Sequence, residues 1–111
     1  MEEGNEPNTE ARGITLTEEA HEDLKAIFDY IAINKLQPLN ARKVQKAIWE
    51  TIYKIRQLPF GFKEYEQDPA KSKMIRRARC LSWLIIYEIT SSEIIILRII
   101  HISKAYTNIN G

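Results

Sequence analysis

The side chains best suited to chemistry gather in the last third of the chain. Arginine guanidinium groups match the geometry of phosphate, and aromatic rings stack on unpaired bases. A histidine, lysine or tyrosine can move a proton to or from a ribose hydroxyl. These residue types are present as Lys73, Arg76, Arg77, Arg79, Trp83, Tyr87, Arg98, His101, Lys104 and Tyr106. Such a set is sufficient for metal-independent RNA cleavage, and equally for binding an acidic surface.

We divide this set by the chemistry expected of each member. The catalytic candidates are Arg77, Arg79, His101, Lys104 and Tyr106. The candidates for contacts with phosphate or RNA are Lys73, Arg76, Tyr87 and Arg98. Because side chains alternate along a strand, Arg77 and Arg79 should share one face and Arg76 should lie on the other.

Each of these assignments has a structural alternative. The arginines of the basic strand could simply be solvated. For Tyr87 we favour a core position over a catalytic one, because its strand face is otherwise apolar. Arg98 lies inside an apolar run and needs a partner, for which Glu88 or Glu93 is available. His101 could merely cap the strand that it ends.

Several common kinds of site are excluded by spacing. The four glycines are too scattered for a phosphate-binding loop, and the single cysteine, Cys80, rules out an internal disulfide. His21 and His101 are too far apart in sequence to suggest a paired metal ligand set. We therefore expect no metal and no cofactor.

The charge is balanced overall but unevenly distributed. Sixteen Lys and Arg oppose fifteen Asp and Glu, giving a formal net charge of +1, yet residues 71–79 hold five basic residues and no acid. No apolar run approaches the ~20 residues that a membrane span needs. The start of the chain is acidic, unlike a signal peptide. We expect a cytoplasmic protein that does not contact a membrane.

The hydrophobic pattern predicts one small α+β domain over residues 13–111, after a flexible acidic leader at residues 1–12. A strand at 14–16 should lead into a helix at 18–34, capped by Thr17. A second helix, capped by Asn40, should end near residue 58, before a loop at 62–72. Three strands follow, at 73–81, 83–89 and 93–100, and their short connections make them antiparallel. The expected order is β-α-α-β-β-β, with an N-terminal strand and a two-helix hairpin packed on an antiparallel sheet.

Two aromatic residues flank the apolar stripe of the second helix. The stripe consists of residues at helical spacing, Val44, Ile48, Ile52 and Ile55, and Trp49 and Tyr53 lie beside it. Such residues either complete the core or form a groove for a partner. Because a domain of this size cannot bury all of its apolar surface, we assign Trp49 and Tyr53 to partner binding.

The order of elements and several segments resemble the RelE/ParE toxin superfamily over residues 14–106. The similar segments are TEEA at 17–20, DLKAIFDYI at 23–31, IRQLPFG at 55–61, IRRARCLSWLIIYEI at 75–89 and EIIILRIIHISK at 93–104. The resemblance implies a toxin that arrests growth and is held inactive by a cognate antitoxin. RelE-like members cleave mRNA on the ribosome without a metal, whereas ParE-like members poison DNA gyrase.

One position departs from the RelE-like pattern. RelE-like toxins usually carry an arginine directly after the aromatic residue of the strand that corresponds to 83–89, and this chain has Leu84 there. Arg76, Arg77 or Arg79 would have to replace it. The ending at 102–104 is also closer to ParE.

Three functions are consistent with these observations, and we favour the first from the sequence, with the other two as alternatives. The first is ribosome-dependent mRNA cleavage by a metal-independent endoribonuclease, which the basic strand together with His101, Lys104 and Tyr106 favours. The second is inhibition of gyrase without nuclease activity, which Leu84 and the ParE-like ending favour. The third is an inactive member that only binds a partner.

Overall fold

The computed structural model describes residues 12–104. Two helices and a five-stranded sheet make up this part of the chain. In order along the chain the elements are β2 (Gly13–Leu16), α1 (Glu18–Asp29), the π-helical turn η2 (Tyr30–Asn34), α2 (Pro38–Gln57), the 3-10 turn η3 (Pro59–Gly61), β3 (Lys63–Glu64), β4 (Ile75–Cys80), β5 (Trp83–Ile89) and β6 (Glu93–His101). The predicted α+β class is confirmed.

The sheet has the order β2-β6-β5-β4-β3. The last three strands pair antiparallel, as their short connections predict. β2 instead pairs parallel with β6, with Gly13 opposite Glu93 and Leu16 opposite Ile96. Parallel neighbours need a long connection, and the helical hairpin lies within the one that joins these two strands. β5 and β6 are interior strands, which explains why their sequences are apolar on both faces.

The first helix begins where the sequence predicts. The Thr17 hydroxyl accepts a hydrogen bond from the Ala20 backbone N–H at 3.1 Å, as an N-cap residue does. Glu18 and Glu19 occupy the first turn, where the helix dipole favours acids. After Asp29 the helix widens into η2, which ends at Asn34. The predicted extent of 18–34 is therefore correct, with a π-helical last part.

The predicted start of the second helix was wrong. α2 begins at Pro38, after Gln37, and the Asn40 side chain does not cap it. Proline suits the first turn of a helix because its fixed φ is helical and the N–H that it lacks would have no partner there. Asn40 instead lies inside the first turn, where its amide donates to Gln37 Oε1 at 3.2 Å.

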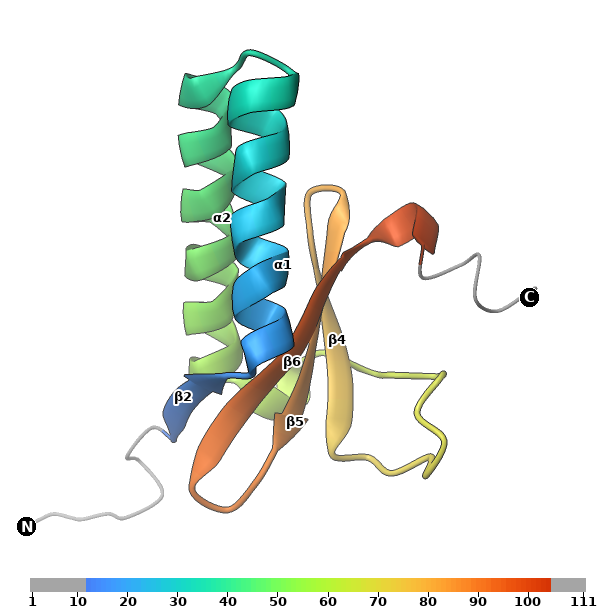
Figure 1. The fold of residues 1–111 in the computed structure, drawn as a ribbon. Helices are drawn as coiled ribbons and strands as arrows, with labels where there is room; N and C mark the ends of the chain where they lie inside the picture. Colours follow the sequence, from blue (N-terminus) through green and yellow to red (C-terminus); the bar gives the residue numbers. More distant parts are fainter. Residues whose placement is uncertain (1–11, 105–111) are drawn as a thin grey trace, which may run out of the picture.

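The helices pack side by side on one face of the sheet, α1 against β6 and α2 against β4 (Figure 1). The stripe predicted from the sequence faces the sheet, since Val44, Ile48, Ile52 and Ile55 are all buried. They meet Ile85, Tyr87 and Ile89 of β5 and Ile94, Ile96 and Ile99 of β6 in one core. Burying each such side chain contributes about 1.5–3 kcal/mol.

The N-terminal end of the described chain is tied into this fold. Arg12, assigned to the leader from the sequence, donates from Nε to the Thr90 carbonyl at 2.7 Å and accepts a bond from Arg56 Nε on its own carbonyl at 2.8 Å. The folded domain therefore includes Arg12. The rest of the expected leader, residues 1–11, lies outside the described residues, as does the catalytic candidate Tyr106. No helix among the described residues is long and apolar enough to cross a membrane.

Tyr87 of β5 is fully buried in the core beneath the helices. Its hydroxyl donates to the Pro59 carbonyl at 2.7 Å, and Phe62 contacts its ring edge-on. Burial raises the pKa of Tyr87 to about 12, although the Arg76 guanidinium acts to lower it. The core position favoured from the sequence is confirmed, and the assignment of Tyr87 to phosphate or RNA contacts was wrong because no ligand can reach it.

The buried phenol makes stability depend on alkaline pH. The pKa of folded Tyr87 lies above the ordinary value of 10.0, so its contribution is complete below that pH and is lost as the pH rises towards 12. Two pKa units correspond to about 2–3 kcal/mol. We expect chemical denaturation to show a loss of this size between pH 10 and pH 12, and Tyr87→Phe to lack it. Tyr53→Phe, which removes an exposed phenol, should retain the loss, and the same loss in Tyr87→Phe would contradict the prediction.

Candidate functional site

The alternation of β4 separates its basic residues from the core. Ala78 and Cys80 point to the helices and are buried. Arg77 and Arg79 therefore lie on the opposite face, as predicted from the sequence. Lys63 of β3 is directly opposite Arg77 in the sheet and shares that face.

These residues surround a shallow hollow of about 410 Å³, which we call the basic hollow. It is lined by Gly61, Phe62, Lys63, Arg77, Arg79 and Ile102. Arg77 forms a bidentate ion pair with Glu66, with Nε and Nη2 at 3.0 Å and 2.9 Å from the two carboxylate oxygens. This contact is the main reason why the pKa of Glu66 is below its ordinary value. The hollow is thus positively charged, with one of its cations already engaged by a carboxylate.

Arg79 is the more accessible of the two arginines. Its Nε donates to the Leu81 carbonyl at 2.9 Å, which holds the stem while the side chain stays exposed. Among the described residues no carboxylate is recorded within ion-pair distance of it. Arg79 could therefore bind a phosphate or a carboxylate of a ligand.

Apolar side chains of β5 lie across the strand pair from both arginines. Leu84 is opposite Arg79 and Ile86 is opposite Arg77, and both are buried. Leu84 is the position where RelE-like toxins usually carry an arginine. A third guanidinium between the strands is therefore missing from the basic hollow.

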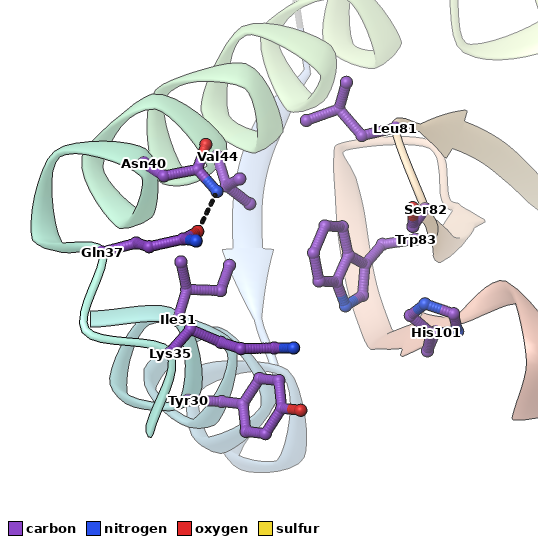
Figure 2. Close-up of a pocket in the computed structure, with 10 residues that line it drawn as sticks. All are labelled: Tyr30, Ile31, Lys35, Gln37, Asn40, Val44, Leu81, Ser82, Trp83 and His101. Atoms are coloured by element: carbon purple, nitrogen blue, oxygen red, sulfur yellow. Dashed lines mark hydrogen bonds between the residues drawn. The ribbon is translucent and has the colours of Figure 1, made fainter. Parts of the chain in front are cut away.

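His101 lies on the other side of the sheet. It is opposite Trp83, whose ring packs against the helix-side core, and the two rings meet edge-on with centroids 5.7 Å apart (Figure 2). Its Nδ1 accepts the Ser103 backbone N–H at 3.2 Å and lies 2.9 Å from the Ser103 hydroxyl. His101 is therefore not assembled with Arg77 and Arg79. Lys104 follows in an exposed helical turn, and Tyr106 lies outside the described residues.

Arg76 connects the strand to the loop that precedes it. Its Nη1 donates to the Phe60 carbonyl at 3.2 Å and to the Phe62 carbonyl at 2.8 Å. Its Nε donates to the Lys73 carbonyl at 2.9 Å, and its guanidinium lies 5.2 Å from the Phe60 ring centroid, within cation–π range. These contacts occupy the guanidinium, so the assignment of Arg76 to phosphate binding is replaced by a structural one. Lys73 is exposed in the turn before β4.

Arg98 has a different ion-pair partner from those expected. It forms a bidentate pair with Asp23 of α1, at 2.7 Å and 3.0 Å, and the same carboxylate accepts the Ile99 backbone N–H at 2.9 Å. Glu88 and Glu93 were the wrong choice because the helix that brings Asp23 to β6 is remote in sequence. The Asp23 contact raises the pKa of Arg98 above its ordinary value, and the pair joins α1 to the sheet.

Comparison with known proteins can now be added to this geometry. The model of the family described as the ParE toxin of the type II toxin–antitoxin system parDE matches residues 14–106. The chain belongs to the ParE toxin family. Comparison with curated protein sequences gives no match.

Solved structures show the same fold. The chromosomal ParDE toxin–antitoxin system of P. aeruginosa matches with a TM-score of 0.68 and 24% identity, covering 83% of this chain and 97% of that one. The E. coli DinJ–YafQ toxin–antitoxin complex matches with a TM-score of 0.52 and 18% identity, covering 86% of this chain and 97% of that one. The expected RelE/ParE superfamily and the toxin class are thereby confirmed.

The aromatic residues of α2 lie on the surface of this ParE family member. Trp49 is 42% exposed and Tyr53 is 55% exposed. The Arg56 guanidinium lies 6.0 Å from the Tyr53 ring centroid, a cation–π arrangement. The two rings therefore do not complete the core. Lys46 and Arg42 continue the exposed line about one and two turns before Trp49, so the surface of α2 is both aromatic and basic.

Sequence reasoning missed Lys63 and Glu66. Both fall in the segment expected to be a loop, yet Lys63 belongs to β3 and Glu66 follows it. A strand of two residues carries no detectable alternation. Glu66 is held near Arg77 by a loop built on Asp68, a buried carboxylate that accepts bonds from the backbone N–H groups of Ala70 and Ser72.

No metal site is apparent in the described part of the toxin. Residues 12–104 hold no group of three His, Cys, Asp or Glu side chains close enough to share an ion.

The ion pair in the basic hollow gives a testable effect on polyanion binding. We expect Glu66→Gln to elute from heparin at higher salt than the parent protein, because Arg77 loses its carboxylate partner. Arg79→Gln should elute at lower salt, with about one counterion fewer released in the salt dependence. Lys25→Gln, in α1 and outside the lining of the basic hollow, is the control for the loss of one positive charge elsewhere. Equal elution of Glu66→Gln and the parent would contradict this account of the hollow.

Proposed function

We propose that this toxin arrests growth by binding a protein target, DNA gyrase, and not by cleaving mRNA. The observation that carries the proposal is the separation of the candidate nuclease residues. His101 lies beside Trp83 on the helix face, whereas Arg77 and Arg79 line the basic hollow on the opposite face. A general acid or base must be within hydrogen-bond reach of the group that it protonates or deprotonates. His101 and the two arginines line different hollows, which does not suit a shared phosphate.

Two further features disfavour a nuclease. Tyr87 is buried with its hydroxyl bonded to Pro59, and the uncharged, buried Leu84 lies opposite Arg79 where RelE-like toxins usually carry an arginine. Membership of the ParE family supports gyrase as the target, because gyrase is the target that a resemblance to ParE-like toxins implies. The basic hollow then supplies a cationic surface for an acidic patch of the target, where charge complementarity promotes association.

The target can be tested with purified protein. We expect the toxin to block supercoiling by gyrase or to trap cleaved plasmid, while mRNA in a translating extract stays intact. Arg79→Glu should need at least about tenfold more protein for half inhibition, because it reverses a charge in the contact. Lys25→Glu should match the parent. Unaffected gyrase together with breaks inside translated codons would establish the ribonuclease instead.

We also propose that a cognate antitoxin covers the exposed aromatic surface of α2. Trp49, Tyr53 and nearby Phe60 are each between 42% and 55% exposed. Exposed aromatic residues of this kind often contribute most of the binding free energy at protein interfaces. The matching ParDE and DinJ–YafQ structures are toxin–antitoxin systems, which agrees with a partner of this class.

The antitoxin surface predicts which substitutions weaken the complex. We expect Trp49→Ala and Tyr53→Ala each to raise the dissociation constant of the complex with the antitoxin encoded beside the toxin by about thirtyfold, as for an interface residue worth ~2 kcal/mol. Isothermal titration calorimetry of each variant with the antitoxin would measure the dissociation constant. Lys54→Ala, an exposed change on the same helix, is the matched control. Unchanged affinity in both aromatic variants would show that the antitoxin binds elsewhere.

A further inference from the structure

A second hollow, on the helix face, has a different chemistry from the basic hollow. It lies between the tip of the helical hairpin and the β4–β5 turn, and we call it the hairpin groove (Figure 2). Its volume is about 510 Å³, a size that falls within the ~300–1,000 Å³ range of small-molecule sites. The side chains important here are Tyr30, Lys35, Gln37, Asn40, Trp83 and His101.

Aromatic rings stand on both sides of the groove. Trp83 projects from β5 towards the helices, and Tyr30 projects from η2 on the helix side (Figure 2). The edge-on contact with His101 fixes the indole, with ring centroids 5.7 Å apart. Such rings offer flat faces for a planar ligand, and stacking of this kind tolerates any nucleobase.

The polar groups of the groove favour an anionic ligand. Among the described residues that line the groove, Lys35 carries the positive charge. Its Nζ lies 5.8 Å from the Tyr30 ring centroid. Within the described part of the chain, no Asp or Glu lines the groove. Gln37 and Asn40 also line it, so the N-terminal end of α2, where the helix dipole is positive, opens on the same space. A cationic ligand is therefore disfavoured.

Hydrogen-bonding groups remain for the edge of a base. The Asn40 amide nitrogen donates to Gln37 Oε1 at 3.2 Å. This bond orients both amides and leaves the Gln37 amide N–H groups and Asn40 Oδ1 for a ligand. His101 Nδ1 accepts from the Ser103 N–H, so Nε2 carries the proton of the neutral ring and can donate.

We propose that the hairpin groove binds an unpaired nucleotide, with its base between Trp83 and Tyr30 and its phosphate near Lys35 and His101. The amides of Gln37 and Asn40 contact the edge of the base. The nucleotide is either free or part of a single-stranded nucleic acid, since both present the same chemistry. The site is separate from the basic hollow and does not depend on which target the toxin has.

Tryptophan fluorescence provides the test. The chain has two tryptophans, so Trp49→Phe leaves Trp83 as the reporter in the full-length protein. We expect AMP, GMP, CMP or UMP to quench Trp83 with a dissociation constant on the order of 0.1–1 mM, as two stacking contacts allow. Lys35→Gln and Asn40→Ala should each weaken binding at least about fivefold, whereas Lys25→Gln should not.

The comparison of probes identifies the source of the nucleotide. An oligouridylate of about eight nucleotides that binds at least about tenfold more tightly than UMP supports a single-stranded nucleic acid. Equal affinity supports a free nucleotide. The proposal is overturned if no nucleotide quenches Trp83, if inorganic phosphate alone reproduces the full signal, or if neither Lys35→Gln nor Asn40→Ala changes the affinity.

Discussion

Strand β5 is hydrogen-bonded along both edges and buried on both faces, and the positions of the functional groups follow from this constraint. Ile85 and Tyr87 face the helices, while Leu84 and Ile86 face the other side, and all are buried. A slip of one residue would move every one of these side chains to the wrong face. The register is therefore fixed, and with it the faces of the neighbouring arginines and of His101.

A small cluster of polar contacts attaches the connection after α2 to this sheet. Tyr87 binds the Pro59 carbonyl, and Arg76 binds the carbonyls of Phe60 and Phe62. Backbone carbonyls that are buried need partners, and leaving one unsatisfied costs about 1–3 kcal/mol. Because the connection is held in this way, β3 lies at the edge of β4 and Lys63 comes beside Arg77. Tyr87 and Arg76, which the sequence assigns to phosphate or RNA contacts, thus support the basic hollow by holding the backbone and do not line it.

The result is a member of the ParE family whose two faces differ in chemistry. The basic hollow offers guanidinium and ammonium groups over an apolar floor, whereas the hairpin groove offers flat rings, amides and one lysine. The sheet itself separates them. One consequence is that a ligand on one face leaves the other accessible, so a macromolecular target and a nucleotide need not compete for the same side chains.

The sequence by itself determined the two helices, the longer strands, the fold class and the division of the β4 arginines, because these depend on periodicity within a single segment. The cap at Thr17, the buried stripe of α2 and the interior strands all follow from such local patterns. Only the tertiary structure decided the partner of Arg98, the start of α2 at Pro38, the β3 edge with Lys63, and the separation of His101 from Arg77 and Arg79. Most of these depend on contacts or pairing between segments far apart in sequence, as Asp23 and Arg98 show. The pairing of the strands, which places β3 and separates His101 from the arginines, is an outcome of packing the whole core, and no local pattern encodes it.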